Sequence, residues 1–465
     1  MFVEIFGSGI FEKDFRRQLL ATLSAIVITF CHGIGLGWLS PMLPKLQSAS
    51  ETPLDFVIDV NEASWVGSMI SFGGFSGNFL FSFVMNRFGR KAALYGLAVP
   101  HTCIWLLLYF ADSVEWLYVA RMCAGLTGGG MFIVLPLFIG EIADKRLCSF
   151  FTLAINIGIM VGFIIASHVP YHVIPFVVIS LPLCYLLLTT RFPETPQQLL
   201  HWGREEDAKR SLKYYCNCDG PAPSKESERA YQKQFDEMRD GLLQQVKEDG
   251  NEGLTMADFC NKRAIKAIMT GLVLMIGNAF TGTFAFINYM SNIFERVHTQ
   301  LEPNTNTIII GAVQIVGTLA SIYLVDRHGR KILLIISCAG TALGTGAFGL
   351  YAFFGDETEA DLSAYSAWLP VTLMAFNIFV ANVGIISVTM VVLVEILPQK
   401  IRAAATSACL GCLSGFAFTS LKAFPLMMEY WGLDVTMWGC AAVSALCLIY
   451  IVIFVEETKG KSIYD

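Results

Sequence analysis

Two basic hexapeptides recur at matching points of the chain and carry charges that could act as a switch. They read Asn-Arg-Phe-Gly-Arg-Lys at 86–91 and Asp-Arg-His-Gly-Arg-Lys at 326–331. After each hexapeptide a carboxylate ends a later apolar stretch, Glu141 in the first case and Glu395 in the second. Breaking a partly buried pair of opposite charges costs roughly several kcal/mol, so such side chains could hold a gate shut. The simpler interpretation is that the basic residues only set the orientation of the chain in a membrane.

Composition indicates which elements position these charges. The chain has 465 residues, of which 54% are hydrophobic and only 15% are charged, and its mean hydropathy is +0.56. A soluble protein carries about 25% charged residues, because its surface must hold water. The net charge is −6, so the chain has no excess of basic residues to attract the phosphates of a nucleic acid, and no nucleic acid partner is expected. We therefore expect a polytopic protein that partners the lipid bilayer.

Twelve apolar stretches are long enough to cross a membrane as helices. A hydrocarbon core of ~30 Å needs ~20 apolar residues in helical form. Helices are favoured because lipid offers no partners for open backbone groups. The stretches are 19–39, 65–85, 92–110, 116–140, 147–168, 172–190, 265–294, 306–325, 332–354, 368–396, 403–424 and 431–455.

The repeated motifs divide these stretches into two like-oriented halves, which is typical of a transporter with its site between the halves. The polar segment between the halves has a helical pattern, although a solvated linker is the alternative. The expected divisions are a cytoplasmic N-terminus at 1–18, an N-terminal six-helix bundle at 19–190, cytoplasmic linker helices at 191–264, a C-terminal six-helix bundle at 265–455 and a cytoplasmic tail at 456–465.

Basic residues predict how the spans are oriented. With the N-terminus placed in the cytoplasm, only Lys45, Arg121, Arg296 and Lys422 fall on the other side, so both termini are expected to be cytoplasmic. Lys422 should extend along its helix to the membrane surface. None of the 13 cysteines falls in a predicted external loop, so no structural disulfide is expected. The single Cys-x-Cys at 216–218 is too little for a metal site.

As a set, the motifs resemble the sugar porter family of the major facilitator superfamily, and within it the insect facilitated trehalose and glucose transporter branch. The resemblance implies an all-α membrane protein with the major facilitator fold, in which twelve transmembrane helices form two six-helix halves with a cytoplasmic helical linker. The matching segments are SWVGS at 64–68, NRFGRK at 86–91, RMCAGLTGGG at 121–130, GEIAD at 140–144, PETPQQLL at 193–200, DRHGRK at 326–331, VEILPQKIRA at 394–403 and EETKGKS at 456–462.

The resemblance also assigns roles to the charged residues. It implies a cytoplasmic gate, a charge network that latches the two halves in the outward-open state. It places Arg121 in a structural network. The gate residues are Arg87, Arg90, Lys91, Glu141, Asp326, Arg327, Arg330, Lys331, Glu395 and Arg402.

Sugar recognition requires amide and hydroxyl groups that hydrogen-bond several substrate hydroxyls. Thr152 stands where the family has a Gln, and Asn156 lies one helical turn further on the same face. The alternative is that such groups only join helices to one another. The candidate substrate-binding residues are Thr152, Asn156, Asn278, Gln314 and Asn382.

The chain departs from the family's pattern in four further places. The span-seven pattern QQLSGxN reads NAFTGTF at 278–284, PIPW of span ten reads SVTM at 387–390, and Asn-Trp of span eleven reads Leu-Ser at 413–414. The amide side chains of the family's pattern are shortened or lost, and two aromatic rings that could stack on a sugar are absent, so the family's usual hexose site is altered. Cys148 replaces an Arg seven residues after Glu141, which predicts a weaker gate and more inward-open population.

We expect a facilitative uniporter that works by alternating access, as a monomer, in the plasma membrane. Its substrate would be a sugar or polyol, with trehalose or a hexose favoured. Residues 19–39 contain no Asp or Glu, which argues against proton coupling. No nucleophile–base pair, phosphate loop or metal quartet is evident, so no enzymatic activity, cofactor or metal is expected. The alternatives are a transporter of a different small organic solute on the same scaffold and a non-transporting sugar sensor.

Overall fold

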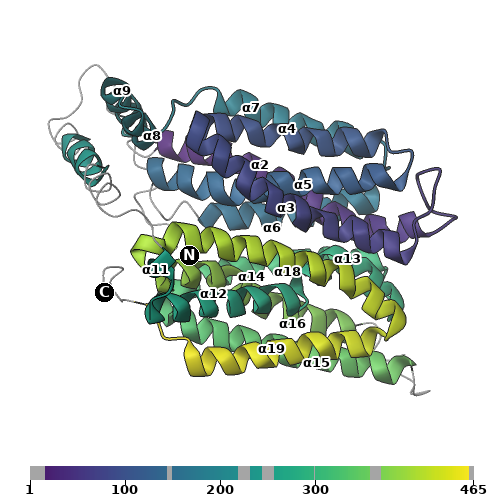
Figure 1. Cartoon of the computed structure of the whole chain (residues 1–465). Helices are drawn as coiled ribbons and strands as arrows, with labels where there is room; N and C mark the ends of the chain where they lie inside the picture. The colour runs from purple at the N-terminus through teal and green to yellow at the C-terminus, as the bar shows by residue number, and fades with distance from the viewer. Residues whose placement is uncertain are drawn as a thin grey trace.

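A computed structural model describes residues 16–143, 149–217, 231–242, 256–297, 299–356 and 368–459, and the regular structure within these ranges is helical. Figure 1 shows the first-half helices stacked above those of the second half. The first-half helices are α2 (Arg16–Gln47), α3 (Val60–Phe88), α4 (Arg90–Tyr109), α5 (Val114–Ile142), α6 (Ser149–His168) and α7 (Ile174–Thr189).

The remaining helices follow the same order along the chain. Between the halves lie α8 (Pro196–His201), α9 (Glu205–Tyr215), a helix at 231–242 and α11 (Met256–Phe259). The second half contains α12 (Lys262–Phe280), α13 (Thr283–Arg296), α14 (Pro303–His328), α15 (Arg330–Asp356), α16 (Leu369–Val383), α17 (Ile385–Ile396), the 3-10 turn η4 (Gln399–Ile401), α18 (Arg402–Tyr430) and α19 (Leu433–Phe454).

Eleven helical segments of the described chain are long and apolar enough to cross a membrane, counting α12 with α13 and α16 with α17 as one each. The twelfth expected span, α7, is apolar but has only 16 residues. The predicted all-α membrane fold is confirmed. The helices cover most of each predicted stretch, because bilayer thickness sets a minimum apolar length and lipid favours a hydrogen-bonded backbone, although α2 extends to Gln47, beyond its predicted end at 39.

Two of the predicted spans are broken rather than continuous. Span seven divides at Gly282, whose φ of +92° lies in the left-handed region that residues other than glycine rarely adopt. Span ten divides at Gly384, where an added Cβ would lie 2.3 Å from the Cβ of Ser337. Hydropathy alone did not predict either break, because both segments are uniformly apolar.

Close packing of small residues holds the first half together. A Cβ on Gly33 of α2 would lie 2.2 Å from the carbonyl oxygen of Ile155 on α6, and a Cβ on Gly125 of α5 would lie 2.0 Å from that of Ile70 on α3. Helices that approach this closely gain van der Waals contact where lipid gives no hydrophobic driving force.

The two halves meet chiefly along α3 with α18, α6 with α14, and α2 with α13, with a smaller contact of α2 with α14. The helix α2 begins at the same end of the bundle at which α19 ends, and α8 and α9 lie there too, at the left in Figure 1. We call this end the terminal face and the other end the opposite face. The expected domain boundaries, and the cytoplasmic location of the terminal face, stay predictions.

Candidate functional site

An ion pair lies at the terminal face of each half. Arg90, at the start of α4, reaches Glu141 near the end of α5, with its Nη2 2.8 Å and its Nε 3.1 Å from Oε1. In the second half the Nη2 of Arg330 lies 3.1 Å from Oε1 of Glu395, which also accepts a hydrogen bond from the hydroxyl of Thr458. Each carboxylate therefore meets a guanidinium, but each of these pairs lies within one half.

A second glutamate caps the helix that carries each of these arginines. The carboxylate of Glu194 accepts the backbone N–H of Lys91 at 3.0 Å, and that of Glu457 accepts the backbone N–H groups of Arg330 and Lys331 at 2.9 and 3.1 Å. The open N–H groups and positive dipole of a helix N-terminus favour an anion at that position. The sequence analysis noted these glutamates only as part of segments that match the family and did not place them in the gate.

The two capping glutamates differ in their electrostatics. Burial raises the pKa of Glu194, although the backbone N–H groups of Thr195 and Lys91 oppose the shift. Burial also acts on Glu457, but backbone N–H groups of four residues outweigh it and lower the pKa of that carboxyl. The ionised form is therefore disfavoured at Glu194 and favoured at Glu457, although the two glutamates cap equivalent helices.

The other predicted gate residues lie around these pairs. The contacts that the structure describes for four of them lie within their own half. Lys91 donates to the carbonyl of Thr190, Lys331 to that of Val452 and Arg402 to that of Leu397, while Arg327 lies over the ring of Tyr323 and Arg87 is exposed. The side chain of Asp326, and the whole of Cys148 on which the weaker-gate hypothesis rests, lie outside the described residues.

At mid-depth, three buried polar residues join the two halves. Gln314 of α14 donates from Nε2 to Oδ1 of Asn156 on α6 at 2.7 Å, and Asn156 donates from Nδ2 to the hydroxyl of Thr318 at 2.6 Å. Thr318 in turn donates to the backbone carbonyl of Gln314 at 2.9 Å. We call these residues the polar triad. Thr318 was missed by the sequence analysis, although its spacing of four residues from Gln314 places it on the same helix face.

The other three candidate binding residues do not join this triad directly. Asn278 donates to the carbonyl of Ile385, just after the break in span ten, and Asn382 donates to its own helix at Ile378. The amide oxygens of Asn278 and Asn382 are buried and accept no hydrogen bond from the described residues. Thr152 lies half-buried on α6, one turn before Asn156. The structure thus brings two of the five predicted residues into contact and leaves two acceptor oxygens unpaired near the broken span.

Arg121 is fully buried between the halves and is held by neutral oxygens. Its Nη1 donates to the carbonyl of Gly35 at 2.9 Å, its Nε to that of Val66 at 3.2 Å, and its Nη2 to Oδ1 of Asn288 on α13 at 2.9 Å. The last bond crosses from the first half to the second. Asn288 was not predicted, since no local pattern links α5 to a residue so distant in the chain.

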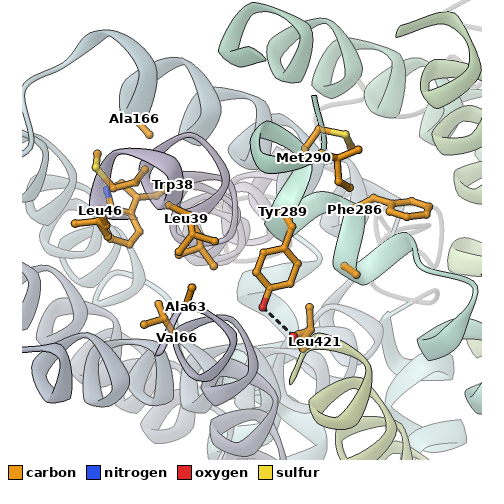
Figure 2. Close-up of a cluster of buried hydrophobic side chains, with 14 of the residues drawn as sticks. Trp38, Leu39, Leu46, Ala63, Val66, Ala166, Phe286, Tyr289, Met290 and Leu421 are labelled. Carbon is orange, nitrogen blue, oxygen red and sulfur yellow. Dashed lines mark hydrogen bonds between the residues drawn. The ribbon is translucent and has the colours of Figure 1, made fainter. Parts of the chain in front are cut away.

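The opposite face is closed by side chains of both halves. The hydroxyl of Tyr289 donates to the carbonyl of Leu421 at 2.9 Å, and its ring stacks on Phe424. Gly67 of α3 makes room for this tyrosine, because an added Cβ would lie only 1.8 Å from the Tyr289 hydroxyl. Figure 2 shows the buried cluster around it, with Trp38, Leu39, Leu46, Ala63 and Val66 from the first half and Phe286, Tyr289, Met290 and Leu421 from the second.

Comparison with known proteins matches nearly the whole chain to one family of transporters. The sequence profile described as Sugar (and other) transporter matches residues 21–465. The chain is 28% identical to the facilitated trehalose transporter Tret1 of Bombyx mori, over 96% of this chain and 86% of that one. It is 27% identical to the Tret1 of Drosophila virilis, of which it spans only 48%. Among solved structures, the inward open conformation of the xylose transporter XylE from E. coli superposes with a TM-score of 0.74 at 20% identity, covering 97% of this chain and 98% of that one.

Proposed function

We propose that this chain, which belongs to the family of sugar (and other) transporters, carries a sugar or polyol across a membrane by alternating access. Membership of the sugar porters is confirmed, as is the major facilitator fold. The finer proposal is facilitative uniport of trehalose or a hexose by a monomer in the plasma membrane, with both termini in the cytoplasm. The trehalose transporters among its relatives support that choice of substrate.

The polar triad is the observation that carries the proposal. Asn156 and Gln314 are 5% and 3% exposed, and the amide of Gln314 donates to that of Asn156 across the boundary between the halves. The hydroxyls of a sugar can replace both partners of such a pair, because each hydroxyl donates and accepts. The unpaired oxygens of Asn278 and Asn382 would accept further hydroxyls, and a buried acceptor left unpaired costs ~1–3 kcal/mol.

The two terminal-face ion pairs support a gate at that end of the path. A carboxylate that already holds one arginine has a second oxygen for another donor, and Oε2 of Glu141 is buried without a hydrogen bond from the part of the chain that the structure describes. We propose that when the terminal face closes, Glu141 and Glu395 bind basic groups of the facing half as well and latch the halves in the outward-open state. The remaining basic residues of the two hexapeptides would supply these groups.

Uniport is supported by what surrounds Arg121. Within α2 the described sequence from Arg16 to Gln47 contains no Asp or Glu, and the partners of Arg121 are carbonyl and amide oxygens. None of these oxygens titrates near neutral pH, so none could carry a proton with the substrate.

The altered segments of spans seven, ten and eleven motivate the two other functions. A different small organic solute on the same scaffold would use the smaller amide set, and a non-transporting sensor would bind a sugar without cycling. Uptake of radiolabelled trehalose, glucose, fructose and a polyol by oocytes separates the three. Saturable uptake of a sugar supports the proposal, uptake of another solute alone supports the second function, and none despite surface expression supports the sensor.

Variants connect the uptake to the site. Gln314→Leu removes the donor to Asn156, and we expect it to raise KM for the sugar by about tenfold through the loss of one or two hydrogen bonds. Thr102→Val is the matched control, because the Thr102 hydroxyl donates to the carbonyl of Ala98 within its own helix in the first half. An equal change in both variants would contradict the assignment of the triad to the substrate.

A further inference from the structure

A lysine of the second half reaches into the first half at the opposite face. The Nζ of Lys422 on α18 lies 2.7 Å from Oδ1 of Asn61, 2.7 Å from the hydroxyl oxygen of Ser64 and 3.3 Å from the carbonyl oxygen of Asn61. It also lies 4.2 Å from the ring centre of Trp65. The sequence analysis expected this side chain to extend to the membrane surface, whereas the structure turns it inward across the boundary between the halves.

The groups that accept hydrogen bonds from this lysine are held in place by the local structure of α3. Asn61 and Ser64 lie in the first turns of α3, which begins with a capping box in which Asp59 and Glu62 each accept the other's backbone N–H. Ser64 donates its own proton to the carbonyl of Asn61 at 2.6 Å, so its oxygen is free to accept from the ammonium. A preorganised set of three oxygens and one ring matches the three protons of a lysine.

Apart from the buried Arg121, which donates to Asn288, the other polar contacts described across this face join neutral groups. Ser40 of α2 bonds to Ser291 of α13, and Gln47 of α2 accepts from Asn292 of α13 at 2.8 Å. Neutral pairs exchange readily with water, whereas hydrogen bonds to a charged donor are about twice as strong. Lys422 is therefore the strongest single polar link described between α3 and α18.

We propose that Lys422 is the latch of the gate at the opposite face and sets how often that mouth opens. Opening this mouth requires the outer ends of α3 and α18 to part, which strips the ammonium of its oxygens and of the Trp65 ring. Lys422 thus holds the closed state of the opposite face against its alternative, opposing the charge pairs of the terminal face. This inference rests on the proposed two-mouth cycle, but it does not depend on which solute is carried.

The test measures the opening directly with spin labels. Cysteines replacing Asp55, in the loop before α3, and Tyr430, at the end of α18, are exposed and lie on different halves. In a background without the 13 native cysteines, pulsed EPR gives the distance distribution between the two labels, without any solute. Lys422→Met keeps the apolar stem but removes every donor, and we expect it to raise the ratio of long to short distances by about tenfold, which equals about 1.4 kcal/mol.

Two further variants keep the test decisive. Lys422→Arg retains the charge and donors and should stay near the unmodified protein. Lys45→Met is the matched control, because Lys45 lies at the same face but donates to Ala166 and Ser167 within its own half, at 3.0 and 3.4 Å. It should leave the distances unchanged. Equal distributions for Lys422→Met and Lys45→Met would overturn the proposal.

The partner side gives an independent check. Asn61→Ala removes one acceptor while leaving the lysine in place, so we expect a smaller shift in the same direction. Combined with Lys422→Met it should add little, because both changes act on one contact. Fully additive shifts would overturn the proposal. Since these distances are measured without solute, a failure to transport sugar would leave the latch standing, and unchanged distances would leave the substrate proposal standing.

Discussion

Replacing Glu141 with alanine should destabilise the fold more than the same change at Glu395. The Glu141 side chain is 4% exposed and its partner Arg90 is 11% exposed, whereas Glu395 and Arg330 are 23% and 17% exposed. Arg90 places two nitrogens within 3.1 Å of the same oxygen of Glu141. Without that carboxylate, Arg90 is left as a nearly buried cation whose other side-chain partner is the amide of Gln198.

The magnitudes follow from this burial. Removing one partner of a buried ion pair costs about 3–5 kcal/mol, because the other charge stays buried without compensation. At Glu395 water reaches both side chains, so we place the loss between the exposed and buried limits, at about 1–2 kcal/mol. Glu141→Ala should therefore lower the free energy of unfolding by about 2 kcal/mol more than Glu395→Ala does.

The assay is denaturant unfolding of the purified protein in detergent micelles, with each variant compared to the unmodified chain. Glu206→Ala is the control, because Glu206 is 81% exposed while it pairs with Lys209 at 3.1 Å, and its loss should change stability by less than about 0.5 kcal/mol. If Glu141→Ala were no more destabilising than Glu206→Ala, the reasoning from burial would be refuted.

Two further predictions concern the opposite face and the capping glutamates. Gly67→Ala should keep the opposite face from closing and lengthen distances between labels across it, because the new Cβ would overlap the Tyr289 hydroxyl; Gly140→Ala, where a Cβ meets nothing within 4 Å, should not. The pKa of Glu194 is raised in the folded state, so acidification from pH 7 towards its usual value of 4.5 should raise the melting temperature relative to Glu194→Gln. The pKa of Glu457 is lowered, so the ionised carboxylate should stabilise the fold above its usual pKa of 4.5, and acidification below 4.5 should lower the melting temperature relative to Glu457→Gln. A change in melting temperature of the same sign in both comparisons would contradict the assigned environments.

The sequence predicts the membrane fold well because its physical causes are local. Span length follows from bilayer thickness, and the charges at span ends follow from the cost of placing them in lipid. Arg90 begins α4 and Glu141 lies near the end of α5, and both belong to motifs that recur in the second half, so the residues could be predicted as a set. Their pairing within one half could not, because it depends on which helices pack together.

The contacts between the halves were much harder to predict. Thr318 and Asn288 bond to residues more than a hundred positions away, and neither stands in a charged or repeated motif. Lys422 on an apolar helix fits a snorkelling side chain equally well until the first turns of α3 are placed beside it. The break at Gly282 has the same origin, since glycine in a span is as compatible with tight packing as with a left-handed turn.

Counterflow tests the central claim, that two halves alternate around a shared polar site to carry a sugar. The purified protein is reconstituted into liposomes loaded with unlabelled trehalose or hexose and then diluted into a trace of the same labelled sugar without a proton gradient. A carrier that exposes one site alternately predicts a transient accumulation of label above its outside concentration, reduced in Gln314→Leu and retained in Thr102→Val. Simple equilibration or no entry for every sugar tested, in protein shown to be folded, would contradict the account.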